Sequence, residues 1–323
     1  MSSSGRLGKV LVSVILVFSA IMVAGVSLGA EKFPSREIVV VVPFPAGGPQ
    51  DLGARVATEF LQKELKVPVV VENRPEAGSI KGILDVYKGK PDGYLLLSTL
   101  FPRYGQTEIV YNTPYKILEM TYLAAFNQSD QLVVVSSASP YKTFKDLVEA
   151  SKKNSLNCGL PGMGSLGHLN AVVIKKKVGM DFEVVPFKGG APNMMALLGG
   201  NVDFICVDDL TTSLQKDKVR PLGISSEKRS PKFPTVPTFK ELGFDMPVMN
   251  SLQGFTAPPG LPEEIRKILS DASAKAIKNP EFMKKTDALG PTPVYMAGPE
   301  FKAAATASYK LVEEYKELFV ESK

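Results

Sequence analysis

The most informative segment of the chain reads IVVVVPFPAGGPQD and occupies residues 38–51. Its first five residues form a continuous β-branched run, which is typical of a strand buried on both faces of a parallel sheet. Prolines and glycines then break the strand, and residues 51–65 carry apolar side chains at the spacing of one helix face. The segment therefore predicts a strand, a glycine-rich loop and a helix.

The same alternation continues on both sides of a break near residue 131. Before the break we predict strands at 67–72 and 94–98 and a helix at 77–88. After it we predict strands at 132–135, 156–160, 182–187 and 202–207, and helices at 143–153, 168–177 and 192–198. Such alternation predicts an α/β fold with two doubly wound sheets.

The last third of the chain is less regular. Four prolines in residues 226–249 predict an irregular segment with at most a short helix near Phe239. A strand is predicted at 253–256, and helices are predicted at 262–277 and 299–321.

Residues 1–30 have the features of an export signal. Arg6 and Lys9 precede an uncharged apolar run, which ends in small residues before Glu31. A retained membrane anchor is the alternative, because about 19 apolar residues just span a bilayer. Neither a cysteine for lipid attachment nor a twin arginine is present in this segment. We therefore expect a soluble periplasmic protein.

Composition excludes several classes of function. The 38 Lys and Arg against 33 Asp and Glu give a net charge of only +5, and Trp is absent, so we expect no nucleic-acid partner. One His and two Cys supply no zinc-type cluster, and we expect neither a metal nor another cofactor. Cys158 and Cys206 are compatible with a disulfide or with two buried thiols.

Three loops follow predicted strands at the edge where open α/β sheets bind ligands. In the first loop, Gly47 and Gly48 allow close approach of a ligand, and the helix start that follows favours a small anion. A plain helix entry capped by Gln50 or Asp51 is the alternative.

The second loop, residues 162–167, reads GMGSLG and formally matches a dinucleotide fingerprint. The next strand ends at Lys188 and not at the acid that would hold a ribose, which disfavours that interpretation. What remains is an anion-accepting helix start, with Ser165 as a hydroxyl donor and Lys188 as a counter-charge. For His168, a hydrogen bond to a ligand is favoured over acid–base catalysis, because no oriented nucleophile accompanies it.

The third loop begins with Asp208 and Asp209. Adjacent residues of a strand point to opposite faces, so these carboxylates are not a ready acid–base pair. We expect one to face the ligand and the other to cap residues 210–213. A metal site is disfavoured, because a hard cation needs more converging oxygens.

A series of motifs runs in order along nearly the whole chain beyond residue 31. The motifs are FPSR at 33–36, VPF at 42–44, AGG at 46–48 with Asp51, AR at 54–55, VVENRP at 70–75 with AG at 77–78, PDGY at 91–94, Gly162 with GS at 164–165 and HL at 168–169, VPFKG at 185–189, LGG at 198–200 with VD at 202–203, KRSP at 228–231 and AP at 257–258. In this set the chain resembles the solute-binding receptors of tripartite tricarboxylate transporters, also called the Bug or TctC family.

The resemblance implies a type II periplasmic-binding-protein fold, with two doubly wound α/β lobes joined by two crossing strands. It places lobe 1 at residues 31–131 and 251–298 and lobe 2 at 132–250, with the C-terminal helix, 299–323, packed across both. It further implies a ligand site between the lobes, formed by Phe44, Ala46, Gly47, Gly48, Gln50, Asp51, Ser98, Thr99, Gly164, Ser165, His168, Lys188, Asp208 and Asp209, with no catalytic residue.

The chain departs from the family pattern at the predicted site. Pro45, Pro49 and Gln50 stand where small residues and Thr are usual, and Asp209 stands where Asn is common. An added carboxylate disfavours a second ligand carboxylate. We therefore consider a monocarboxylate, or an acid with a neutral or cationic far end, beside the usual dicarboxylate.

These observations favour a monomeric, non-enzymatic receptor that captures a small organic acid and delivers it to membrane permease subunits. A periplasmic carboxylate sensor that signals to a two-component kinase is the main alternative. An exported enzyme using His168 with Asp208 or Asp209 is a third and weaker one.

Overall fold

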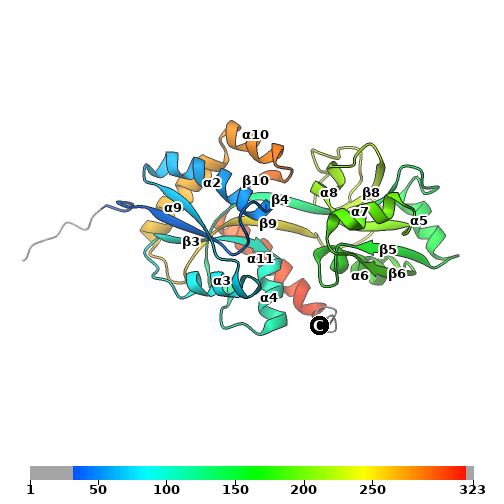
Figure 1. Ribbon diagram of the computed structural model, residues 1–323, viewed down its shortest axis with the longest axis horizontal. Coiled ribbons are helices and arrows are strands. Elements are labelled where there is room, and N and C mark those ends of the chain that lie inside the picture. Colours follow the sequence, from blue (N-terminus) through cyan, green and yellow to red (C-terminus); the bar gives the residue numbers. More distant parts are fainter. Residues whose placement is uncertain (1–31, 318–323) are drawn as a thin grey trace, which may run out of the picture. The chain divides into compact units, whose positions relative to one another are not determined.

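The computed structural model describes residues 32–317, so the predicted export signal at residues 1–30 lies outside the described residues. The chain divides into two compact units, and all elements described below belong to the one that begins at Arg36. In this part of the chain ten strands form one sheet with the order β2-β1-β3-β9-β4-β7-β5-β6, while β10 and β8 also pair with β4 (Figure 1).

The sheet has two sections that share β4. In the first section, β1, β2 and β3 are parallel, and β9, β4 and β10 are antiparallel to their neighbours. Its strands are β1 (Ile38–Val42), β2 (Val69–Asn73), β3 (Leu95–Phe101), β4 (Thr121–Ser136), β9 (Asn250–Ala257) and β10 (Thr292–Ala297). In the second section, β5, β6 and β7 are parallel, and β8 pairs antiparallel with β4. Its further strands are β5 (Leu156–Leu160), β6 (Phe182–Pro186), β7 (Phe204–Asp208) and β8 (Val219–Ser225).

Helices connect and cover both sections, and the sheet–helix alternation predicted from the sequence is confirmed. The first section carries α2 (Pro49–Leu65), η1 (Glu76–Ser79), α3 (Ile80–Tyr87), α4 (Arg103–Tyr111), η2 (Ile117–Glu119), α9 (Glu263–Ile277), α10 (Pro280–Ala288) and α11 (Gly298–Glu314). The second carries α5 (Phe144–Ser151), α6 (Leu166–Val178), α7 (Gly190–Leu198) and α8 (Asp209–Ser213).

Each section has its own hydrophobic core. In the first, Val41 and Leu97 of the sheet pack with Phe301 of α11. In the second, Phe182 and Cys206 pack with the side chains of α5 and α6. The Sγ atoms of Cys158 and Cys206 lie 3.9 Å apart as free thiols, well beyond a disulfide bond of about 2.05 Å.

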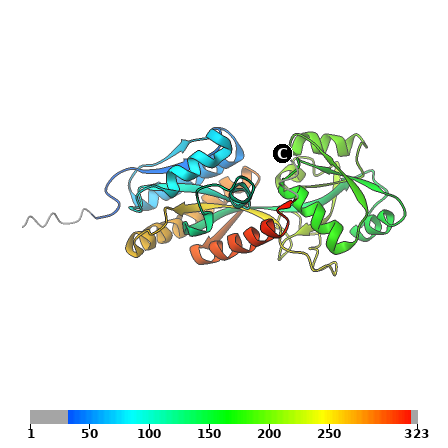
Figure 2. The ribbon, with the colours of Figure 1, turned by 90° about the horizontal axis from the view of Figure 1, so that it is seen from below.

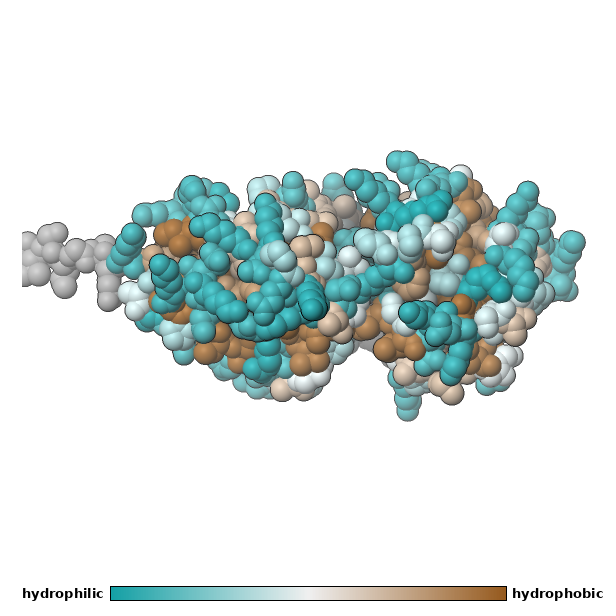
Figure 3. Space-filling view, turned by 90° about the horizontal axis from the view of Figure 1, so that it is seen from above, coloured by the Kyte–Doolittle hydropathy of each residue, from teal (hydrophilic) through white to brown (hydrophobic). Residues whose placement is uncertain are grey.

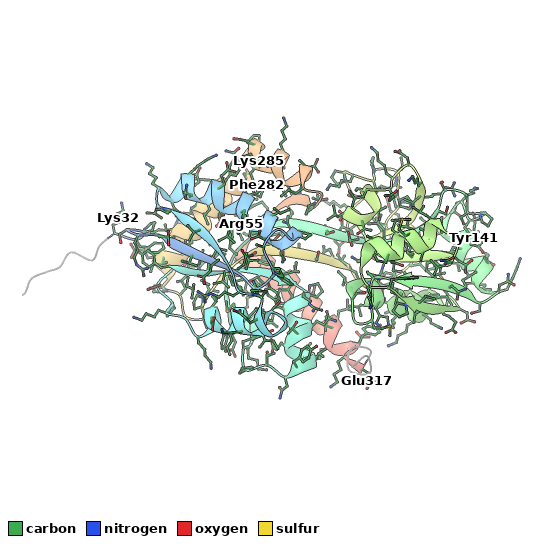
Figure 4. All side chains as sticks on the ribbon, viewed as in Figure 1. Lys32, Arg55, Tyr141, Phe282, Lys285 and Glu317 are labelled. Carbon is green, nitrogen blue, oxygen red and sulfur yellow. The ribbon has the colours of Figure 1, made fainter. Side chains whose placement is uncertain are left out.

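Helix α2 follows the first glycine-rich loop, so the contacts of α2 also position that loop. Helix α10 packs on α2, since Phe282 makes an edge contact with Phe60 at 5.7 Å and Lys285 pairs with Glu59 at 2.9 Å (Figure 4). No helix was predicted at α10, whose contacts hold α2 and therefore the first loop in place.

Strand β4 is much longer than the predicted strand at 132–135, and this prediction was wrong by eleven residues at its start. Its first part, through Asp130, pairs with β9, and its last part, from Gln131, pairs with β7 and β8. The strand therefore passes without interruption from one section to the other. The lobe boundaries after residues 131 and 250 stay predictions.

Helix α11 contacts elements of both sections. It lies along β4 and α4, while Val312 and Tyr315 join a cluster with Leu169 and Val173 of α6 (Figure 2). The helix ends at Glu314, seven residues before its predicted end.

The visible surface in Figure 3 is mostly hydrophilic, with hydrophobic residues in separate areas between the charged side chains. No helix within residues 32–317 has the length and the apolar character that crossing a membrane requires.

Candidate ligand-binding site

A cavity of about 930 Å³ opens where the two sheet sections meet. The first loop, the start of α4, strands β4 and β9, and the starts of α6 and α8 form its wall. The lining residues are Phe44, Pro45, Ala46, Gly47, Gly48, Pro49, Gln50, Leu100, Phe101, Pro102, Arg103, Gln106, Asn127, Ser129, Gln131, Ser165, Leu166, Asp208, Leu210, Thr211, Ser251, Gln253 and Pro291. A smaller cavity of about 350 Å³ lies along residues 224–248. The larger cavity is the candidate site, because two helix N-termini open into it.

The first loop presents backbone to the cavity. Gly47 has φ +82°, a conformation that residues with a side chain rarely adopt, and Gly48 begins α2 without a side-chain cap. The first N–H groups of α2 therefore have no partner within the helix, and the helix dipole adds positive potential. The Nε2 atom of Gln50 is buried without a hydrogen-bond partner among the described residues. This wall of the cavity suits an anion.

Asp51 supports the first loop and does not line the cavity. Its carboxylate accepts hydrogen bonds from Gly47 N, Arg55 Nε and Asn73 Nδ2, each at 2.9 Å. Burial opposes ionisation, but these hydrogen bonds and the charge of Arg55 outweigh it and lower the pKa of Asp51. Its position indicates a role in holding the glycine backbone in place.

Two further predicted residues, Ser98 and Thr99, are buried behind the cavity wall. Ser98 Oγ accepts a hydrogen bond from Gln253 Nε2 at 3.0 Å, and the hydroxyls of Thr99 and Thr256 lie 2.6 Å apart. Neither residue lines the cavity, and Ser98 reaches a lining residue through its hydrogen bond to Gln253.

The second loop brings the N-terminus of α6 to the cavity. Ser165 caps this helix, because its Oγ accepts from His168 N at 3.1 Å. The same hydroxyl donates to Gly162 O at 2.7 Å, so the expectation that it donates to a ligand is corrected: its proton is engaged within the loop. Ser165 lines the cavity, and Gly164 lies directly behind it.

His168 has a structural partner in the same loop. Its Nδ1 accepts a hydrogen bond from Gly164 N at 3.0 Å, and burial lowers its pKa. The side chain is 3% exposed and does not line the cavity. Lys188 is exposed and also lies outside the lining, so the predicted counter-charge is not at the cavity wall.

Asp208 and Asp209 point in different directions, as expected for neighbours at a strand end. Asp208 lines the cavity and also caps α8, accepting from Thr211 N at 2.8 Å. Asp209 is fully buried and hydrogen-bonds to Ser129 Oγ. Burial raises the pKa of Asp209 to about 6. The carboxylate at the cavity wall is therefore that of Asp208, and Asp209 lies behind the wall.

The residues that form the floor of the cavity were not predicted from the sequence, apart from Asp208. The floor consists of alternate residues of β4, namely Asn127, Ser129 and Gln131, with their cross-strand partners Gln253, Ser251 and Asp208. Asn127 Nδ2 donates to Gln253 Oε1 at 2.8 Å, and Gln253 Nε2 donates to Gln50 O at 2.7 Å. The available signal was the unbroken polar run at 127–131 between two apolar runs.

The start of α4 also escaped prediction. Arg103 is exposed at this helix start and is the one positively charged side chain among the described lining residues. Gln106, one turn further on, donates from Nε2 to Gly164 O and so joins α4 to the second loop. The starts of α4 and α6 therefore lie together on one side of the cavity.

Apolar side chains complete the lining. Phe44 stacks on Tyr104 at a centroid distance of 6.2 Å, and Leu100, Phe101, Leu166 and Leu210 contribute further apolar surface. Such a cavity suits an organic ligand with a hydrophobic body and a few polar groups. Within the described residues, no group of three or more His, Cys, Asp or Glu side chains is placed to hold a metal ion.

Comparison with known proteins gives the family. A family model described as the tripartite tricarboxylate transporter family receptor matches residues 53–310. The chain belongs to this family. Its members are solute-binding receptors and not enzymes, so the predicted family and the non-enzymatic role are both confirmed.

Two curated relatives cover most of this receptor. A Cupriavidus necator protein described as "UPF0065 protein in gbd 5'region" is 33% identical over 87% of the chain and 86% of its own length. The protein BugT of Bordetella pertussis is 32% identical over 88% of the chain and 89% of its own length.

Solved structures confirm the type II periplasmic-binding-protein fold. A TctC solute-binding protein from Polaromonas, without ligand, has a TM-score of 0.83 at 29% identity, over 90% of this chain and 99% of that one. MatC from Rhodopseudomonas palustris, with bound malate, has a TM-score of 0.62 at 27% identity, over 90% of this chain and 99% of that one. An R. palustris protein with adipate has a TM-score of 0.68 at 25% identity, over 88% and 98%.

Proposed function

We propose that this receptor captures a small organic carboxylate in the 930 Å³ cavity and delivers it to the membrane permease subunits of a tripartite transporter. One observation carries the proposal: the N-termini of α2 and α6, from different sheet sections, open into the same cavity. Helix N-termini bind anions through free N–H groups and the helix dipole. The malate and adipate held by two solved relatives are acids of this kind.

The site supports binding without turnover. The Nδ1 atom of His168, the one histidine of the chain, accepts a hydrogen bond from Gly164 N, and the side chain does not line the cavity. Both carboxylate oxygens of Asp208 accept hydrogen bonds from Thr211, and each keeps a further acceptor site for a ligand donor. Affinity would therefore come from backbone N–H groups, amide side chains and ordered water.

A thermal-shift screen tests the proposal. Protein freed of carried-over ligand is heated with monocarboxylates, dicarboxylates, tricarboxylates, amino acids and aromatic acids. A ligand that binds only the folded state stabilises it by about 2.7 kcal/mol at a hundredfold excess over Kd. We expect a dose-dependent rise in Tm with one class of acid, and the acid recovered unchanged. No rise with any acid would refute the carboxylate site.

Delivery and location need separate measurements. Uptake of the labelled acid by cells should require both this receptor and the permease subunits of its transporter, and uptake that persists without the receptor would contradict the transport role. We also propose that the receptor is exported to the periplasm. The exported form should then lack about the first 30 residues in its intact mass, as expected for a cleaved signal.

A further inference from the structure

The two ends of the polar cavity floor differ in their hydrogen-bonding groups. Side chains alternate along a strand, so Asn127, Ser129 and Gln131 share the face of β4 that lines the cavity. Four residues of extended strand span about 13 Å. The floor therefore runs from the Asn127–Gln253 pair beside α2 to the Gln131–Asp208 pair at the end of β7.

Hydrogen-bond donors and positive potential gather at the α2 end of this floor. Within residues 32–317, Gln50 Nε2 is a buried donor without a partner, and the first N–H groups of α2 have no partner in the helix. Arg103, at the start of α4, lies on the neighbouring wall, where the next residue, Tyr104, stacks on Phe44 of the first loop. A ligand carboxylate is best placed at this end.

Acceptors gather at the opposite end. Gln131 is 5% exposed, and its Oε1 is buried without a hydrogen-bond partner among the described residues. Its cross-strand partner is Asp208, and directly paired residues project their side chains on the same face with Cβ atoms about 5 Å apart. The two side chains thus present a neutral and a charged acceptor to the same part of the cavity.

The surroundings of this acceptor pair are also acidic. Asp209 follows Asp208, and Asp130 precedes Gln131 on the face of β4 turned away from the cavity. Lys232, whose charge acts on Asp209, does not line the cavity; it pairs with Asp287 at 3.5 Å and donates to Gly290 O. A second ligand carboxylate at this end would meet acceptors of its own charge.

We propose that the ligand is a monoanionic acid with an apolar body whose far end donates hydrogen bonds to Gln131 and Asp208. The inference rests on the proposed function, since it assigns the two ends of an acid in the same cavity. A site built to accept a donor rejects an analogue that lacks it, because buried acceptors are left unpaired. The receptor should therefore distinguish ligands by the group at the end near Gln131 and Asp208, and not by the carboxylate at the α2 end.

Matched pairs of acids test the inference by titration calorimetry at one pH and salt concentration. Succinate, glutarate, adipate and suberate are each compared with their own monoamide, which replaces one carboxylate by a neutral donor of nearly the same shape. At the chain length that binds best, we expect the monoamide to bind about tenfold more tightly or better. Equal or tighter binding of the diacid would overturn this inference and leave the carboxylate receptor standing. Failure of every acid to bind would overturn both.

Variants locate the effect. D208N keeps an oxygen to cap α8 and should narrow the ratio of monoamide to diacid affinity to about threefold or less. Q131M keeps the side-chain length without the acceptor and should weaken the monoamide about tenfold while changing the diacid little. D217N removes an exposed carboxylate elsewhere and is the control. An unchanged affinity ratio in D208N would refute the role of Asp208.

Discussion

Between pH 5 and pH 8, the free energy of unfolding of the receptor is expected to fall. Replacing Asp130 by asparagine should abolish most of this fall. Asp130 is 3% exposed, and Gln128 Nε2 donates to its Oδ1 at 2.6 Å. Burial and the nearby charge of Asp209 raise the pKa of Asp130 to about 7. The folded protein therefore holds a proton on this carboxyl in a pH range where the unfolded chain has released it.

The sign and the size of the effect follow from this shift. The pKa of Asp130 moves from 3.8 in the unfolded chain to about 7 in the folded protein. The contribution of protonated Asp130 to the free energy of unfolding is therefore fully present below pH 3.8 and is lost as pH rises toward 7. At about 1.36 kcal/mol per pKa unit, the part lost between pH 5 and pH 8 is about 2.5 kcal/mol. Asparagine has no charge to bury and still accepts from Gln128, so D130N should lack this part.

Urea unfolding at several pH values between 5 and 8 measures the effect as the free energy of unfolding. D217N, which removes an exposed carboxylate, should keep the pH slope of the wild type. His168 acts in the opposite sense below about pH 6.5, because burial lowers its pKa, but it is present in all three proteins. A D130N protein with the same slope as wild type would refute the buried, protonated carboxyl.

Three further outcomes are expected. G53A should weaken ligand binding about tenfold in calorimetry, because its methyl group would lie 2.6 Å from Gln253 Oε1; unchanged affinity would show that the floor does not contact the ligand. D51A should lower the free energy of urea unfolding by about 2 kcal/mol and weaken binding, since it leaves the donors of the first loop unpaired; a stability equal to wild type would contradict its bracing role. The thiols of Cys158 and Cys206 should react with Ellman's reagent only in denaturant, because both are 0% exposed and the thiolate is the reactive form; no thiol in denaturant would mean a disulfide instead.

The parts of the fold that the sequence predicted are those with local signals. A buried strand such as β1 is a β-branched run closed by proline and glycine, and a helix such as α2 carries apolar residues at the spacing of one helix face. The glycine-rich loops of the site were found for the same reason, because they stand between a recognisable strand and helix. Their meeting at one cavity follows from the strand order, which the α/β pattern implies.

The parts that the sequence did not predict depend on partners far along the chain. The first half of β4 contains Asn127, Gln128, Ser129 and Asp130, which interrupt any apolar period. These residues become strand because they pair with β9, and Asn127 meets Gln253 across 126 positions of sequence. Arg103 follows a proline that closes β3, so its place at the cavity wall is set by α4, a nine-residue helix whose start has no side-chain cap.

The cost of the polar floor is itself an argument for a ligand. A strand that crosses the interior is most stable when its side chains are apolar or fully paired, and an unpaired buried polar atom costs about 1–3 kcal/mol. Gln50 Nε2 and Gln131 Oε1 are such atoms, and they lie at opposite ends of the same cavity, one a donor and the other an acceptor. A ligand with an acceptor at one end and a donor at the other would pair both atoms at once. Binding would therefore remove the free-energy cost that the two unpaired atoms impose on the empty receptor. For this reason the ligand that fits both ends should also give the largest rise in Tm.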